Sequence, residues 1–233
     1  MEPTAAIEAT TDTKGGAFDL VMTGGPVVWL LMVLSIIALT IIIYKLVQFM
    51  MTGMGKTAHV ERAVQLFREG RRTEALAAVQ GAKDPTSMAV ATAIRGTMRP
   101  DASDALVREE VERVASVGIN GLKSQLSILD LIGSLSPLLG LLGTVLGMIE
   151  AFRAMEAAGR NVDPAILSGG IWAALLTTAA GLIVAIPVVA VSSWFERAIQ
   201  RCAHRTEDAV TRIFTPDLTH RTESTPNEIR AAQ

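Results

Sequence analysis

The chain has 233 residues, of which 50% are hydrophobic and 19% are charged, and its formal net charge is −2. This balance excludes the strongly basic surface that binds nucleic acid. The one cysteine, Cys202, excludes an internal disulfide. Cys202 and the three histidines, His59, His204 and His220, lack metal-ligand spacing, so we expect them at the surface and predict no metal or cofactor.

Three uncharged stretches are long enough to cross a bilayer. The first is predicted over 20–44, and its densest part, PVVWLLMVLSIIALTIIIY at 26–44, covers roughly 28 Å as a helix. The others are predicted over 131–149 and 164–195. The acidic segment before the first stretch excludes a cleavable signal peptide. The sequence therefore predicts an all-α integral membrane protein with three transmembrane helices.

The segment GMGKT at 53–57 looks like part of a phosphate-binding loop. Such a loop needs a further glycine where this chain has Met50, and it must follow a buried strand. Here it follows an apolar run of helical length. We therefore interpret it as a flexible, basic exit from the first span, and ATP is not the expected energy source.

The placement of lysine and arginine predicts the orientation in the membrane. Most of these residues lie in 45–130 and 196–233, and few lie in 1–19 and 150–163. We therefore expect the first two segments inside the cell and the last two outside. A basic flank follows the third span on the inner side, formed by Arg197, Arg201 and Arg205.

The inner segment 45–130 is predicted to be helical. One helix carries Val60, Val64 and Phe67 and ends at Gly70, and a second covers Thr73 to about Gln80. A third begins at Pro85 after Asp84, and Ser103 caps a fourth. Because no proline intervenes before Pro137, we expect the fourth helix to continue unbroken into the second span. The third span is likewise expected to extend inward, into a C-terminal helix and tail over 196–233.

Small residues recur along one face of each of the last two spans. In lipid, helices associate by close backbone approach over such residues, so we predict packing faces, and we expect them to be buried between subunits. Thr144 either bonds its own helix or faces a water-filled seam. Pro187 frees the carbonyl of Ile183. The packing residues of the two faces are Gly133, Pro137, Gly140, Gly143, Gly147, Gly170, Ala174, Gly181, Ala185 and Pro187.

The second and third predicted spans contain stretches that resemble the signature spans of the ExbB/TolQ/MotA proton-channel family. They are GLLGTVLGMIEAF at 140–152 and GGIWAALLTTAAGLIVAIP at 169–187, and the first span is similar to that of ExbB-type transporters. The resemblance implies a bacterial inner-membrane homopentamer, with 1–19 and 150–163 periplasmic and 45–130 and 196–233 cytoplasmic. Its implied partners are a single-span ExbD/TolR-type protein, a TonB-type protein, further copies of the chain, and membrane lipid. The implied energy source is the proton-motive force, used for TonB-dependent transport across the outer membrane.

The resemblance also implies roles for particular residues. Thr144 and Thr178, with the adjacent Thr177, match the positions that line the ion pathway. Many family members carry a glutamate where this chain has Ala173, so the partner's aspartate would supply the proton acceptor. Three spans argue against the MotA branch. A TolQ-like subunit for outer-membrane constriction and a non-conducting membrane scaffold remain as alternatives. An enzyme is not expected, because the sequence has no nucleophile–base pair, metal cluster or carboxylate dyad.

Overall fold

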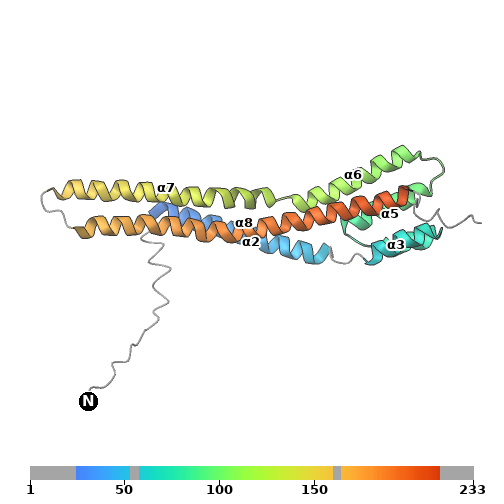
Figure 1. The fold of residues 1–233 in the computed structure, drawn as a ribbon, viewed down its shortest axis with the longest axis horizontal. Helices are drawn as coiled ribbons and strands as arrows, with labels where there is room; N and C mark the ends of the chain where they lie inside the picture. Colours follow the sequence, from blue (N-terminus) through green and yellow to red (C-terminus); the bar gives the residue numbers. More distant parts are fainter. Residues whose placement is uncertain (1–24, 53–57, 160–163, 216–233) are drawn as a thin grey trace, which may run out of the picture. The chain divides into compact units, whose positions relative to one another are not determined.

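The computed structural model describes residues 25–52, 58–159 and 164–215, and these residues form helices and no strand. The GMGKT segment, His220 and the chain's tails lie outside the described residues. In chain order the helices are α2 (Gly25–Thr52), α3 (Ala58–Arg68), α4 (Arg72–Val79), α5 (Pro85–Thr97), α6 (Asp104–Lys123), α7 (Leu126–Ala158) and α8 (Pro164–Phe214) (Figure 1).

Three helical stretches of the described chain are long and apolar enough to cross a membrane. They are α2, the stretch that ends with α7, and α8 from Leu167 onward. The fold is thus that of an all-α integral membrane protein, as the uncharged stretches predict.

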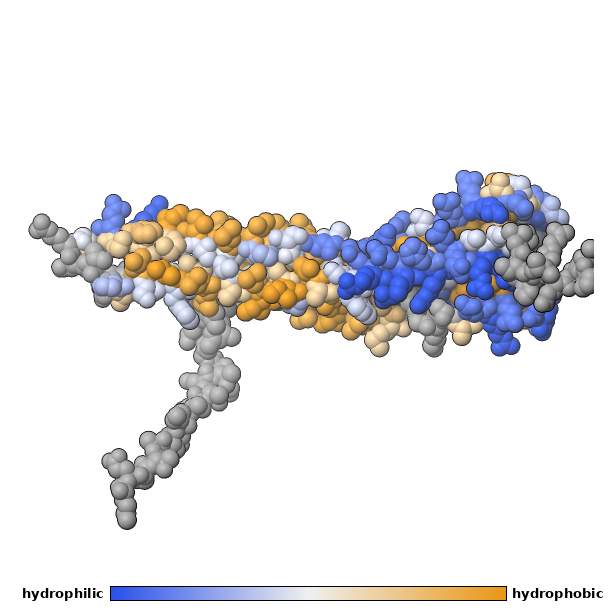
Figure 2. All heavy atoms as spheres, in the orientation of Figure 1, coloured by the Kyte–Doolittle hydropathy of each residue, from blue (hydrophilic) through white to orange (hydrophobic). Residues whose placement is uncertain are grey.

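The chain divides into two compact units. Of the described residues, the span unit comprises 25–43, 127–159 and 164–193. The helical unit comprises 44–52, 58–126 and 194–215, so α2 and α8 contribute to both. Figure 2 shows that hydrophobic residues dominate the visible surface of the span unit and hydrophilic residues that of the helical unit. The span unit therefore has the surface of a structure that contacts lipid.

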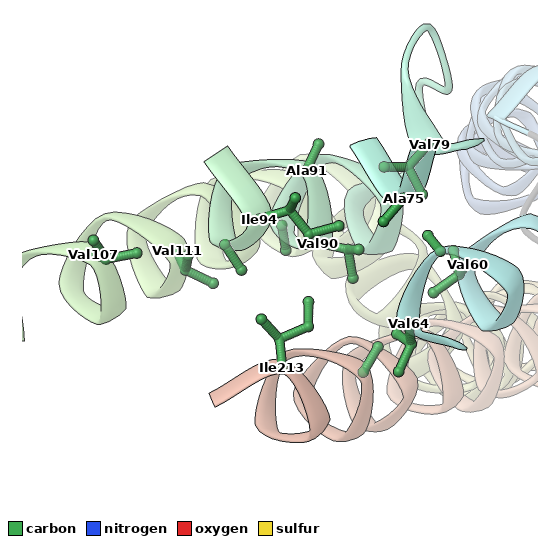
Figure 3. Close-up of a cluster of buried hydrophobic side chains, with 14 residues drawn as sticks. Val60, Val64, Ala75, Val79, Val90, Ala91, Ile94, Val107, Val111 and Ile213 are labelled. Carbon is green, nitrogen blue, oxygen red and sulfur yellow. The ribbon is translucent and has the colours of Figure 1, made fainter. Parts of the chain in front are cut away.

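The helical unit has its own hydrophobic core, drawn in Figure 3. Small and β-branched side chains from α3, α4, α5, α6 and the end of α8 meet in it, so the helices approach closely. At Gly96 an added Cβ would lie 2.1 Å from Cγ1 of Val107, a position only hydrogen can fill. The labelled core residues are Val60, Val64, Ala75, Val79, Val90, Ala91, Ile94, Val107, Val111 and Ile213.

Local sequence signals in the helical unit predict several helix ends correctly. Pro85 is the first residue of α5, and the Asp84 side chain accepts a bond from the backbone N–H of Ser87. Ser103 caps α6 in the same way through Leu106. Gly70, after α3, has a φ of +79°, in the left-handed region that glycine adopts without steric cost.

The expectation of one unbroken helix from Ser103 into the second span is wrong. α6 ends at Lys123, and Gln125 has a φ of 67° before α7 begins at Leu126. For a residue with a Cβ this conformation costs roughly 1–2 kcal/mol. Hydrogen bonds to the last carbonyls of α6 offset that cost. The Ser124 hydroxyl donates to the Gly121 carbonyl at 2.8 Å, and the Ser124 N–H donates to the Asn120 carbonyl at 3.0 Å.

Lys45 completes the end of α6. Its Nζ donates to the Leu122 carbonyl and to Gln48 Oε1, both at 2.9 Å, and the side chain has no solvent exposure. A cation at a helix C-terminus also interacts favourably with the helix dipole. Lys45 is therefore a buried cap that holds α2 against the end of α6.

α7 and α8 pack against each other over their small residues. A Cβ added at Gly181 would lie 2.6 Å from the Ser136 carbonyl oxygen and 3.1 Å from Cα of Gly140. Along the helices Gly133 meets Val189, and Gly147 meets Ala174, which defines an antiparallel register. The expectation that these faces lie between subunits is therefore wrong for the contacts described, since they join two consecutive helices of one chain.

Gly181→Ala tests this packing. The added methyl group would meet backbone atoms of α7, which no side-chain rotation relieves, so we expect a destabilisation of about 1–3 kcal/mol. The control is Gly169→Ala in the same helix, where nothing lies within 4 Å of the added Cβ. It should be neutral or slightly stabilising. Thermal unfolding midpoints of both purified variants in one detergent decide the point, and equal midpoints would contradict the close approach.

Candidate functional site

Two threonine hydroxyls converge on one carbonyl in the middle of the α7–α8 contact. Thr177 Oγ1 donates to the Ala174 carbonyl at 2.7 Å and lies 3.3 Å from the Gly140 carbonyl oxygen, so its one proton is shared between them. Thr178 Oγ1 donates to the same Gly140 carbonyl at 3.2 Å. A carbonyl oxygen has two lone pairs and can accept both. The contact thus combines backbone approach with polar bonds across the helices.

The two threonines differ in exposure. Thr177 is 4% exposed, whereas Thr178 is half-buried. Consecutive residues of a helix point about 100° apart, so the two hydroxyls reach Gly140 from different sides of α8. Thr177 and Thr178 therefore lie on two different faces of α8, yet both hydroxyls contact the same carbonyl of α7.

Thr144 does not join this cluster. Its Oγ1 donates to the Leu141 carbonyl of its own helix at 2.6 Å, and the residue is half-buried. This bond within its own helix is one of the two alternatives expected for Thr144. Thr144 follows Gly140 by four residues, so it lies one turn further along α7 on the same side of the helix.

Two further predicted packing residues, Gly143 and Gly147, lie along the same contact. A Cβ at Gly143 would lie 2.5 Å from Oγ1 of Thr177, and one at Gly147 would lie 3.1 Å from the Cβ of Ala174. Pro137 is half-buried and Pro187 is exposed, and both lie inside continuous helices.

The contact contains no charged side chain between 131–149 and 164–195. At one end of it, Ser192 donates to Asp130 Oδ1 at 2.5 Å. Ala173, where the resemblance implies a glutamate, is half-buried in α8. The polar side chains of these two stretches are hydroxyl groups and the indole N–H groups of Trp172 and Trp194, which do not titrate near neutral pH.

Two polar contacts escape prediction from the sequence. The antiparallel register that pairs Gly133 with Val189 also brings Asp130 beside Ser192, but that register is known only from the structure. Lys45 carries a weaker signal, as a single lysine inside the continuous helix α2. Its acceptor lies 77 residues away in the sequence.

The predicted basic flank lies in the helical unit. Arg197, Arg201 and Arg205 are exposed on α8 and form no ion pair with another described residue. Just before them, the ring of Phe49 lies 5.0 Å from that of Phe195 and 6.3 Å from that of Trp194, measured between centroids. Of these residues, tryptophan is of a type that is enriched where a span meets the aqueous phase.

Cys202 is buried, contrary to the expectation that it lies at the surface. Its Sγ lies 3.7 Å from Thr86 Oγ1, which is 2.8 Å from Thr206 Oγ1. Contact with α5 therefore covers the thiol, and burial raises its pKa. Such a thiol reacts slowly, since the thiolate is the nucleophile.

The two described histidines differ. His59 is half-buried, and its Nε2 lies 2.8 Å from Ser87 Oγ and 3.4 Å from Asp84 Oδ1, whereas His204 is exposed. Among the described residues there is no group of three or more His, Cys, Asp or Glu side chains that could hold a metal ion.

The chain is similar in sequence to proteins named ExbB and TolQ. The chain is 47% identical over 85 residues to biopolymer transport protein exbB1 of Vibrio cholerae, covering 35% of this chain and 37% of the relative. It is 29% identical over 181 residues to a putative biopolymer transport protein ExbB homolog of Methanothermobacter thermautotrophicus, covering 77% of this chain and 63% of the relative. It is 37% identical over 120 residues to the Tol-Pal system protein TolQ of Pseudomonas aeruginosa, covering 50% and 47%. The chain thus spans less than two thirds of each relative's length.

The sequence profile described as the MotA/TolQ/ExbB proton channel family matches residues 81–208. This range covers α5, α6, α7 and most of α8, and with them every threonine and glycine of the contact described above. The match extends over more than half of the chain, and the chain therefore belongs to the MotA/TolQ/ExbB proton channel family.

Proposed function

We propose that the chain is an inner-membrane subunit of a motor complex driven by the proton-motive force. With an ExbD-type single-span partner and a TonB-type protein, it energises TonB-dependent transport across the outer membrane. The observation that carries this proposal is the family match over residues 81–208, because it includes both helices of the threonine contact. The ExbB-named relatives support the ExbB role among the family's branches.

The chain contributes hydroxyl groups and the partner contributes the titrating group. Thr178 and Thr144 would solvate a partner carboxylate and position water beside it, and Thr177 would hold α8 against Gly140. This division follows from the absence of charge over 131–149 and 164–195. A carboxylate at this depth is costly unless it faces water or protein, so a single acidic group on a central partner fits the arrangement.

The assembly and orientation belong to the same proposal. Five copies would surround the partner, with 1–19 and 150–163 in the periplasm and 45–130 and 196–233 in the cytoplasm. The exposed Arg197, Arg201 and Arg205 support a cytoplasmic helical unit. The apolar surface of the span unit supports contact with lipid and with other copies.

Two alternatives have observations in their favour. The similarity to TolQ supports a role in outer-membrane constriction with a TolR-type partner. The local bond of Thr144 and the alanine at 173 support a scaffold that conducts nothing. Cells that lack the chain distinguish the first from the ExbB role, since they would lose either energised uptake or envelope integrity.

Thr178→Val and Thr144→Val distinguish conduction from scaffolding. Each change keeps the side chain's shape and removes its hydroxyl. We expect partner-dependent uptake of an iron complex to fall at least about fivefold, the factor that corresponds to 1 kcal/mol. Thr40→Val is the matched control, because Thr40 Oγ1 donates only to Ile36 of its own helix, at 2.8 Å, on the exposed side of α2. Wild-type uptake in both test variants, at normal expression, would favour the scaffold.

Single cysteines test the orientation. Cys202 is buried and unsuitable, so Cys202→Ser serves as the background. Glu156→Cys replaces an exposed residue in the segment between the second and third spans, and Gln200→Cys replaces an exposed residue after the third span. A membrane-impermeant thiol reagent should label Glu156→Cys in spheroplasts and Gln200→Cys in inverted vesicles. The reverse pattern would overturn the orientation.

A further inference from the structure

A cavity of about 490 Å³ lies inside the span unit, between the beginning of α2, the second half of α7 and α8. It is separate from the side of α7 that carries Thr144, which does not line it. The residues that line it are Gly25, Pro26, Val27, Gly143, Leu146, Gly147, Ile149, Glu150, Arg153, Ala173 and Thr177.

The lining changes from charged to small and hydroxyl-bearing. Glu150 and Arg153 are exposed, beyond the uncharged part of α7, whereas Thr177 is 4% exposed. Between them the lining includes the small residues Gly143, Gly147 and Ala173. Purely apolar cavities stay dry, whereas a cavity with polar groups in its lining offers water the hydrogen-bond partners that it needs. With about 30 Å³ per molecule in the liquid, a cavity of about 490 Å³ has room for roughly fifteen waters.

Thr177 forms the inner end of the cavity. Its hydroxyl proton is directed at the Ala174 and Gly140 carbonyls, so its oxygen remains available to accept a hydrogen bond from water. The Gly140 carbonyl also accepts from Thr178. Only the Gly140 carbonyl, which contacts both hydroxyls, therefore lies between Thr178 and water that reaches Thr177.

We propose that this cavity is a water-filled inlet by which protons from the outer face reach the contact of α7 and α8 within each subunit. The inference rests on the proposed proton-channel function and orientation. Glu150 provides a carboxylate that can accept a proton at the mouth, where Arg153 also lies, and Thr177 orients the innermost water. Ala173 matters because its methyl group leaves the passage open, and a bulky group attached there would close it.

The first test measures access of water. In a Cys202→Ser background, Ala173→Cys introduces a thiol on the cavity lining, and Trp172→Cys introduces one at the neighbouring position, where the side chain is 67% exposed on the span unit's surface. Both lie at the same depth. A cationic, impermeant methanethiosulfonate reagent applied to spheroplasts should modify Ala173→Cys at least about tenfold faster, because a charged reagent is excluded from hydrocarbon. Modification of Ala173→Cys no faster than of Trp172→Cys would overturn the inlet.

The second test measures proton flux. Proteoliposomes that contain Ala173→Cys together with the single-span partner should conduct protons before modification, as reported by a pH-sensitive dye. Attachment of the reagent should then reduce flux at least about fivefold, while the modified Trp172→Cys protein keeps its flux. Unchanged flux after full modification of Ala173→Cys would contradict the inlet alone. Absence of flux in the unmodified wild-type complex would instead contradict the proposed function, whatever the labelling rates.

Discussion

The backbone contact of α7 with α8 at Gly140 and Gly181 is the constraint on which the span unit depends. Lipid tails are as apolar as leucine, so helices in a bilayer gain little from burying apolar surface and associate through close packing and polar bonds. The contact supplies both, because the approach that leaves no room for a Cβ at Gly181 also brings the Gly140 carbonyl within reach of Thr177 and Thr178. A larger side chain at either glycine would separate the helices and remove the hydroxyl contacts together. The close packing of the two helices and the threonine hydrogen bonds therefore depend on the same contact.

The same register fixes where charge can lie. It pairs Asp130 with Ser192 at one end, and near the other end it pairs Ala151 with Gly170, one residue beyond Glu150. The acidic groups are thus confined to the two ends of the contact, and hydroxyls are its main polar side chains in between. Lys45, the buried cation of the helical unit, binds a carbonyl and an amide rather than a carboxylate. Its role is to complete a helix end.

The sequence predicts features that depend on neighbours along the chain. Uncharged length predicts the spans, Asp84 and Ser103 predict helix starts, and the spacing of Gly140 and Gly147 predicts a packing face. The sequence does not predict which helix packs on that face. The same glycine spacing would suit a helix of the same chain or a helix of another copy. The break at Gln125 lacks glycine or proline and depends on Lys45, and the burial of Cys202 depends on Thr86 of α5. Each of these follows from a contact between distant segments.

The adjacent threonines of α8 link two sides of one helix without forming a continuous relay. Both hydroxyls donate to the Gly140 carbonyl, and a carbonyl can accept hydrogen bonds but has no proton to pass on. A proton that travels from the Thr177 side to the Thr178 side therefore needs water between them. Water requires space in an interior that is otherwise packed to the density of a crystal. Such a space lies beside Thr177, where Gly143, Gly147 and Ala173 line a cavity. Gly143 and Gly147 therefore have two roles, because they let α8 approach α7 and also form part of the wall that water would contact.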